Sequence, residues 1–200
     1  MSGSGGRNAL LFVCTGNTCR SPMAEALARA AVEERLPGSG LEVVSAGTFA
    51  APGAPAADEA VRVAGEHGLD LEVHRSQPLT RELLDRARLV LCMSGSHRGV
   101  AADLGAGDRA VLITRYLPPE DPMRDEGVPD PIGGGPGPYR EAFEVLRRAV
   151  DGLVAELAGE GDGEGAHGAG GPGAPGGGPH GSGGIPGPSG AGPEARGGGP

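Results

Sequence analysis

The chain has 200 residues, with 26 acidic residues against 17 arginines, no lysine, and a formal net charge of −9. This acidic balance argues against nucleic acid as the main partner, and an aromatic content of 2% leaves few side chains on which bases could stack. Three cysteines, with neither a signal peptide nor a long apolar run, predict a reducing, cytoplasmic setting and no membrane segment.

Composition divides the chain into three parts. Residues 1–7 form a polar, glycine-rich leader, and residues 8–158 hold enough apolar residues for one domain with a sizeable core. Segment 159–200 is dominated by Gly and Pro, and Ile185 is its one large apolar residue. Such a segment cannot bury enough surface to offset its ordering entropy, so we expect a disordered tail.

The domain begins with an apolar run at residues 8–14, which predicts a buried strand followed by a polar loop. Ser21 and Pro22 are typical of a helix start, because a capping hydroxyl precedes a proline whose missing N–H costs nothing there. We predict a helix over residues 22–36. Its buried face is expected to hold Met23, Leu27, Ala30 and Ala31.

Strands and helices alternate through the rest of the domain. Further strands are predicted at 41–45, 88–93 and 110–113, and further helices at 56–67, 81–86 with Thr80 as its cap, 95–104 capped by Ser94, and 139–157. The alternation predicts a single α/β domain with a four-stranded parallel sheet and helices on both faces. Such sheets bind ligands at the carboxyl ends of their strands, which places the expected site in the loop after the first strand.

That loop contains Cys14, five further residues, then Arg20 and Ser21. A loop that feeds a helix N-terminus directs several backbone N–H groups and the positive end of the helix dipole at one point, which suits a phosphate. A cysteine in such surroundings is expected to be a nucleophilic thiolate, and an arginine can bind two phosphate oxygens at once. We therefore predict a phosphate-binding loop with its own nucleophile rather than a structural cysteine and an unrelated surface arginine.

The run FVCTGNTCRSP, from Phe12 to Pro22, resembles the active-site loop of the low-molecular-weight protein-tyrosine-phosphatase family. That family also includes bacterial protein-arginine phosphatases and thioredoxin-coupled arsenate reductases. The resemblance extends through segments 45–47 and 89–93 to 128–131, so it covers roughly residues 8–158. It implies a cysteine-dependent phosphatase, acting through a phosphocysteine on phosphotyrosine or phosphoarginine in proteins. We expect no cofactor, and no metal site because the five histidines are scattered and the cysteines lack paired zinc spacing. We expect a monomer that binds neither nucleic acid nor membrane.

A thiolate that attacks phosphorus expels a leaving group, which needs a proton from a general acid. The long segment 114–138 contains two Asp-Pro pairs, at Asp121 and at Asp130. The resemblance favours Asp130, which lies just before a glycine-containing turn and the last helix. Asp121 and Asp125 are expected to be solvated loop charges.

The resemblance also implies supporting roles around the loop. Asn17, which tolerates a positive φ, is expected to join Ser45 and His74 in one network. Ser21 would donate a hydrogen bond to the Cys14 sulfur and help it to leave. Cys19 has two interpretations, a reversible disulfide with Cys14 or a small buried hydrophobic residue. The complete set expected to bind phosphate or support the loop is Thr15, Gly16, Asn17, Thr18, Cys19, Ser21, Ser45 and His74.

The substrate remains open between two phosphorylated side chains. Thr18 is the residue type of the arginine phosphatases, whereas the tyrosine phosphatases usually carry an apolar β-branched residue there. Both groups usually carry an aromatic residue at the position of Ile132, so Ile132 favours neither of them. Thr18 then leaves a slight lean to phosphoarginine. Arsenate reduction needs resolving cysteines, and only Cys92 lies in the right half of the domain. A non-catalytic phosphate-binding module is disfavoured because nucleophile, arginine and acid are all present.

Overall fold

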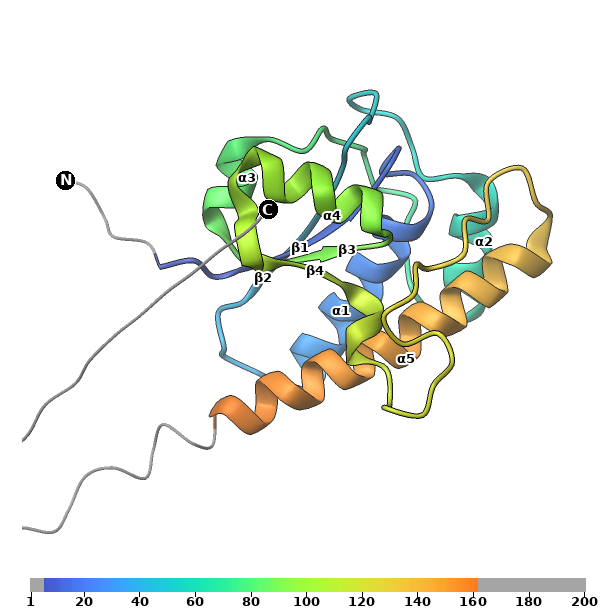
Figure 1. The fold of residues 1–200 in the computed structure, drawn as a ribbon. Coiled ribbons are helices and arrows are strands. Elements are labelled where there is room, and N and C mark those ends of the chain that lie inside the picture. Colours follow the sequence, from blue (N-terminus) through green and yellow to red (C-terminus); the bar gives the residue numbers. More distant parts are fainter. Residues whose placement is uncertain (1–5, 162–200) are drawn as a thin grey trace, which may run out of the picture. The chain divides into compact units, whose positions relative to one another are not determined.

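The computed structural model of the protein describes residues 6–161 (Figure 1). Most of the expected leader and tail, residues 1–5 and 162–200, lies outside the described residues. The sheet has four parallel strands in the order β2-β1-β3-β4. These strands are β1 (Ala9–Cys14), β2 (Glu42–Gly47), β3 (Ala87–Cys92) and β4 (Ala110–Leu112).

The apolar sequence of β1 explains its central position. All six of its residues are buried, with Leu10 and Phe12 packed on one face of the sheet and Leu11 and Val13 on the other. A strand covered on both faces needs a continuous apolar run rather than an alternating one. Because side chains alternate, Cys14 at the strand's end lies on the same face as Leu10 and Phe12.

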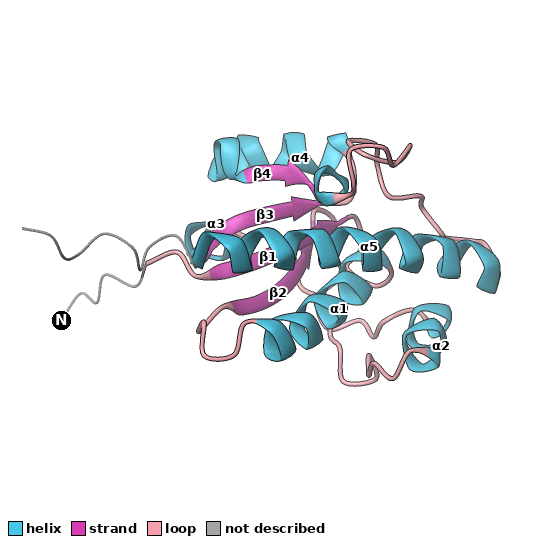
Figure 2. Ribbon diagram, turned by 90° about the horizontal axis from the view of Figure 1, so that it is seen from below, coloured by secondary structure: helices cyan, strands magenta, loops and turns pink. Residues whose placement is uncertain are grey.

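Helices cover both faces of the sheet, as predicted from the sequence (Figures 1 and 2). One face packs against α1 (Arg20–Arg35), α2 (Asp58–Glu66) and α5 (Pro136–Gly161). The other face packs against α3 (Arg81–Arg86), α4 (Gly95–Ala101) and the π-helical turn η1 (Ala102–Ala106). Two 3-10 turns, η2 (Gly107–Arg109) and η3 (Ile113–Tyr116), flank β4. The fold prediction of a single α/β domain with a four-stranded parallel sheet is confirmed.

The start of α1 differs from the prediction. The helix begins at Arg20, its N-cap Cys19 makes no side-chain capping bond, and Ser21 lies inside the first turn. The predicted cap is therefore wrong, because the Ser21 hydroxyl is used by the loop instead. The predicted buried face is also partly wrong, since Ala30 is exposed and the small residues Ala24 and Ala28 are buried.

The bounds of two other helices, α5 and α4, also differ from their predicted positions. Helix α5 begins three residues before the expected 139, because prolines are accepted in a first turn, and it continues past the expected domain end at 158. Helix α4 stops before the expected 104, and Gly105 has a φ of 112° in the turn that follows. The caps were correctly predicted, since Thr80 accepts from the Leu83 N–H and Ser94 from the His97 N–H. Between residues 6 and 161, every helix is too short or too polar to cross a membrane.

Candidate active site

The segment from Cys14 to Arg20 joins the carboxyl end of β1 to the start of α1. The Cys14 side chain is buried, its sulfur lies 3.3 Å from the Asn17 backbone nitrogen, and that N–H donates to it. The Ser21 Oγ lies 3.0 Å from the same sulfur. Because Ser21 Oγ accepts a hydrogen bond from the Asn17 amide at 2.9 Å, its own proton is free to point at the sulfur. Both contacts suit a sulfur that carries negative charge.

Asn17 holds the loop from the β2 side. Its φ of 54° lies in the left-handed region, which Asn tolerates. Its Nδ2 donates to Ser45 Oγ at 2.8 Å, and its Oδ1 accepts from the Gln77 N–H at 2.9 Å. The His74 Nε2 lies 2.8 Å from the Asn17 carbonyl oxygen. The structure thus brings together Asn17, Ser45 and His74, and every hydrogen-bonding group of the Asn17 amide has a partner.

Three further residues complete this network and had no assigned role in the sequence analysis. Glu25 accepts a hydrogen bond from Ser45 Oγ, and Gln77 donates from Nε2 to the Ser45 carbonyl oxygen at 2.9 Å. Gly47 lets the end of β2 approach the loop, because a Cβ there would lie 2.4 Å from the Thr15 carbonyl oxygen. A network of this kind has no fixed spacing in the sequence, so only the fold could reveal these members.

Arg20 reaches from the loop to the segment that carries Asp130. Its side chain is buried, Nη1 donates to the Val128 carbonyl oxygen at 3.2 Å, and Nη2 lies 2.6 Å from Asp130 Oδ2. The Asp130 side chain is half exposed, and its Oδ1 accepts from the Ile132 N–H at 3.2 Å. A guanidinium has five N–H donors, so these contacts leave others that can bind phosphate oxygens.

The two other aspartates of this segment lie in different surroundings. Asp121 pairs with Arg148 on α5 at 3.0 Å and accepts from the Met123 N–H, which together with the arginine lowers the pKa of its carboxyl. Its side chain is 11% exposed, so the prediction that Asp121 is a solvated charge is wrong. Asp125 is exposed, with a φ of 62°. Asp130 is the member of the three that contacts Arg20.

Cys19 is a buried free thiol within the loop. Its sulfur lies 3.2 Å from the Tyr139 hydroxyl oxygen and 3.6 Å from Thr18 Oγ1. Burial raises the pKa of Tyr139, and the hydrogen bond to Cys19 adds to that effect. Thr18 is half-buried, and its hydroxyl would lie 3.4 Å from a Cβ placed on Gly16, so it stands over the glycine of the loop.

His97, for which the sequence analysis assigned no role, contacts the other side of the loop. Its Nε2 lies 2.9 Å from Thr15 Oγ1, and its Nδ1 lies 2.7 Å from Ser94 Oγ. Burial, with the positive charge of Arg20 as a second cause, lowers the pKa of His97 to about 4. The imidazole is therefore neutral at neutral pH.

Two exposed apolar side chains stand beside the loop. Phe49 is 88% exposed, and its N–H donates to the Thr15 carbonyl oxygen at 2.9 Å. Ile132, two residues after Asp130, is 72% exposed. Single exposed apolar side chains are common on folded domains, so what distinguishes Phe49 is its backbone contact with the loop. Phe49 lies in a loop without a distinguishing pattern, and the sequence analysis missed it.

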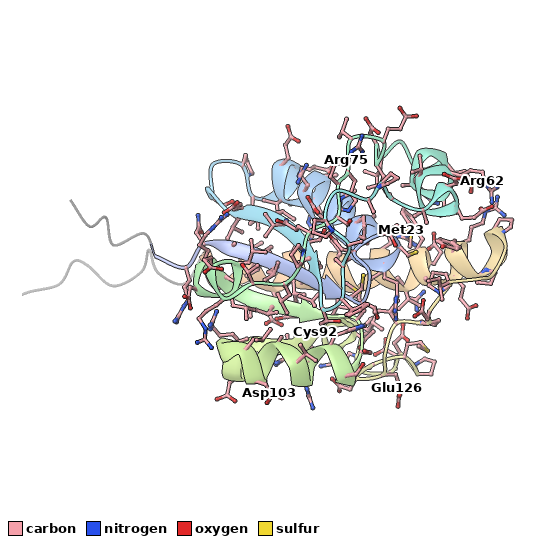
Figure 3. The ribbon with its side chains drawn as sticks, turned by 90° about the horizontal axis from the view of Figure 1, so that it is seen from above. Met23, Arg62, Arg75, Cys92, Asp103 and Glu126 are labelled. Atoms are coloured by element: carbon pink, nitrogen blue, oxygen red, sulfur yellow. The ribbon has the colours of Figure 1, made fainter. Side chains whose placement is uncertain are left out.

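Cys92 occupies the opposite face of the sheet from Cys14. It is fully buried at the end of β3, where it pairs with Val13, and it packs in the cluster formed with α3 and α4. Figure 3 shows Cys92 inside the fold. Burial raises the pKa of its thiol to about 12. Cys92 therefore behaves as a core residue, as expected.

Comparison with known proteins agrees with this architecture. The profile of the family described as "Low molecular weight phosphotyrosine protein phosphatase" matches residues 9–162. A protein-arginine-phosphatase of Geobacillus stearothermophilus is 39% identical over 150 residues, which cover 74% of this chain and 95% of the relative. A probable low molecular weight protein-tyrosine-phosphatase, EpsP, of Ralstonia nicotianae is 37% identical over 148 residues, covering 74% and 94%.

A solved structure of the YwlE arginine phosphatase, a mutant with a phosphorylated active-site serine, superposes with a TM-score of 0.68. The two are 36% identical, and the match covers 74% of this chain and 95% of that one. The family profile spans most of the chain and the relatives are covered almost completely. The chain therefore belongs to the low molecular weight phosphotyrosine protein phosphatase family of hydrolases.

Proposed function

We propose that the protein hydrolyses phosphorylated protein side chains through a phosphocysteine on Cys14, with phosphoarginine as its preferred substrate over phosphotyrosine. The observation that carries the proposal is one loop at the carboxyl end of β1 that begins at Cys14 and ends at Arg20, whose guanidinium contacts the Asp130 carboxyl. In this proposal Cys14 attacks the phosphorus, Arg20 binds the phosphate and Asp130 transfers the proton. The phosphorylated active-site serine in the YwlE mutant supports a covalent phosphoryl-enzyme in this family.

In the first step, the Cys14 sulfur attacks phosphorus while Arg20 and the loop N–H groups bind the three phosphoryl oxygens. A sulfur–phosphorus bond forms, and the bond from phosphorus to the leaving oxygen or nitrogen breaks with its electron pair. Asp130 gives its proton to that leaving atom. Arg20 contacts Asp130 in the structure, so a bound phosphate would share the guanidinium with this carboxyl group.

In the second step, water attacks phosphorus on the phosphocysteine. The Asp130 carboxylate takes a proton from that water, the sulfur–phosphorus bond breaks, and inorganic phosphate leaves. The Ser21 hydroxyl, 3.0 Å from the sulfur, stabilises the departing thiolate through a hydrogen bond. The enzyme returns to its starting state with Asp130 protonated.

The lean to phosphoarginine rests on Thr18. Its hydroxyl lies close to Gly16 and Cys19 in the loop, and in this proposal it orients the attacking water, which an apolar residue could not do. Two relatives with this activity in their names, from Geobacillus stearothermophilus and Bacillus subtilis, are 39% and 38% identical to the chain, but relatives named as probable tyrosine phosphatases are 37% and 41% identical, so identity alone favours neither substrate. The exposed Phe49 is the observation on the other side, because its ring could stack on phosphotyrosine.

The test compares two peptides with the same sequence, one carrying phosphoarginine and one carrying phosphotyrosine. The expected result is a larger kcat/KM on the phosphoarginine peptide, with both activities lost in Cys14→Ser. A larger kcat/KM on phosphotyrosine would overturn the substrate preference and leave the phosphatase proposal standing. If Cys14→Ser still hydrolysed both peptides, the assignment of Cys14 as the nucleophile would be overturned.

Arsenate reduction is disfavoured by the position of Cys92. A resolving cysteine must reach the oxidised Cys14 sulfur, but Cys92 is fully buried on the other face of the sheet. The remaining cysteine, Cys19, is a member of the loop itself. Transfer of oxidising equivalents away from the loop therefore lacks a carrier within residues 6–161.

A further inference from the structure

His97 is a buried imidazole for which the proposed chemistry has no use. It is 5% exposed, and both ring nitrogens are occupied by hydroxyls, Nε2 by Thr15 and Nδ1 by Ser94. Thr15 is the loop residue directly after the nucleophile, and Ser94 caps α4 by accepting from the His97 N–H. The ring thus connects the phosphate-binding loop to the junction between β3 and α4.

The same junction holds the segment that carries the proposed acid. The Met93 carbonyl oxygen accepts from the Val128 N–H at 2.8 Å, and a Cβ on Gly127 would lie 3.3 Å from that oxygen. The Val128 carbonyl oxygen in turn accepts from Arg20, whose other nitrogen contacts Asp130. In Figure 3 the loop of Glu126 lies beside the end of β3 near Cys92.

These contacts form a continuous ring of linked residues around the site. It runs from Thr15 through His97 to the β3–α4 junction, on to Val128, and through Arg20 back to the loop. Asn17 holds the loop from the β2 side, whereas His97 holds it from the β3 side. A group fixed from both sides has little freedom to drift, which proton transfer and in-line attack both require.

We propose that His97 is a positioning residue, which ties Thr15 to the β3–α4 junction and thereby fixes the Cys14 sulfur relative to the Asp130 carboxyl. The inference rests on the proposed function, because it needs Cys14 as nucleophile and Asp130 as acid. His97 contacts neither the substrate nor the reacting atoms in this assignment. It acts through the Thr15 hydroxyl and the junction.

The chemistry of a neutral imidazole suits this role. One ring nitrogen donates and the other accepts, so His97 can bind two hydroxyls without adding a full charge beside Arg20. Its low pKa agrees with that neutral state. A neutral ring whose nitrogens are both hydrogen-bonded is also a poor proton donor, which separates its role from that of Asp130.

The test measures how the rate depends on the leaving group. A well-placed acid protonates the leaving atom and makes kcat/KM similar for aryl phosphates with good and poor leaving groups. If the acid is displaced, the poor leaving group suffers most. The substrates are p-nitrophenyl phosphate, with a good leaving group, and phenyl phosphate, with a poor one.

The first variant is Thr15→Val, which removes the hydroxyl from an exposed residue, keeps the side-chain shape, and preserves the His97–Ser94 contact. We expect kcat/KM to fall about tenfold or more on phenyl phosphate and by much less on p-nitrophenyl phosphate, as part of the 10²–10⁴-fold that a positioned acid supplies. His97→Ala should show the same pattern. The double variant should lose no more kcat/KM than the worse single variant, because both substitutions remove the same hydrogen bond between Thr15 and His97.

His67→Ala is the matched control, since His67 is an exposed histidine that stacks on Phe143 rather than on the loop. It should leave the ratio of the two rates unchanged. An unchanged ratio in Thr15→Val, or additive losses in the double variant, would overturn the role of His97. Asp130→Asn separates the two proposals: if it also leaves the ratio unchanged, the assigned acid is wrong and the proposed function falls first.

Discussion

The Asn17 amide donates a hydrogen bond to the Ser45 hydroxyl over 2.8 Å, and this contact joins a loop residue at positive φ to the end of β2. Ser45 passes the connection on to Glu25 in α1. The loop is thereby fixed to two elements that the sheet already orders. A tight loop of this kind keeps its N–H groups pointing at one place only if such contacts hold it there.

Ser45→Ala should therefore weaken both folding and catalysis. It leaves one Asn17 N–H and the Glu25 carboxylate without their buried partner, which costs about 1–3 kcal/mol in the free energy of unfolding. Urea unfolding measures this loss, and kcat should fall because the loop is less ordered. Ser39→Ala is the control, since Ser39 is exposed and its hydroxyl accepts a hydrogen bond from the nearby Leu41 N–H. Equal stability of the two variants would show that the network contributes little.

Cys14→Ser should abolish turnover while vanadate still binds. The hydroxyl is a far weaker nucleophile than a thiolate, but Arg20 and the loop N–H groups remain to hold the oxyanion. Calorimetric titration with vanadate and a turnover assay make the two measurements. Cys92→Ala is the matched cysteine control: it should lower stability by leaving a core cavity, and it should keep most of the activity. Appreciable turnover by Cys14→Ser would contradict the assignment.

Asp130→Asn and Asp121→Asn should separate catalysis from stability. The first removes the proposed acid and should lower kcat by roughly 10²–10⁴-fold, with little change in the unfolding midpoint because Asp130 is half exposed. The second breaks the contact with Arg148 on α5 and should lower the midpoint while kcat changes little. The opposite pattern would make Asp121 the acid. Thermal unfolding and kcat on one substrate are sufficient.

The choice of Asp130 over Asp121 illustrates what the sequence could predict. Both are followed by proline in one long segment, and local pattern alone cannot tell them apart. The sheet and its helices could be predicted from the spacing of apolar residues, because each buried strand and each amphipathic helix has a characteristic spacing within its own segment. The Cys14 to Arg20 loop is equally local. Asp121 pairs with α5, which is a tertiary contact that its own neighbours do not encode.

His97 and Gln77 were missed for the same reason. Each acts through contacts with residues far away in the chain, Thr15 in one case and Asn17 and Ser45 in the other. A single histidine in an amphipathic helix is also usual on a surface, so its type carries no signal. The misplaced Ser21 cap arose differently, because a Ser-Pro pair predicts a helix start but cannot show that a nearby thiol binds the same hydroxyl.

His97 should make the stability of the fold depend on pH. Its pKa is about 4 in the folded chain because of burial and the Arg20 charge, against about 6.5 for an unperturbed histidine. Between these values the unfolded chain binds a proton that the folded chain does not, so stability is full above about pH 6.5 and is lost as the pH falls toward 4. The expected loss at pH 4 is about 3 kcal/mol. Urea unfolding from pH 7 to pH 4 should show a flatter profile for His97→Asn, and parallel profiles would contradict the assignment.

Thr18→Ile should change the preference between the two candidate substrates. The substitution replaces the hydroxyl that lies close to Gly16 and Cys19 by an ethyl group at a half-buried site, which should cost little stability if the ethyl group points to solvent. A larger apolar wall suits a flat phenyl ring and crowds a guanidinium-linked phosphate together with its attacking water. One such group typically discriminates by about 1–3 kcal/mol, or 10–200-fold. We expect kcat/KM on the phosphoarginine peptide to fall at least about tenfold, and kcat/KM on the phosphotyrosine peptide to stay constant or rise. Equal losses on both peptides would mean that Thr18 only shapes the loop, because a hydroxyl that merely supports the backbone cannot distinguish a guanidinium from a phenol.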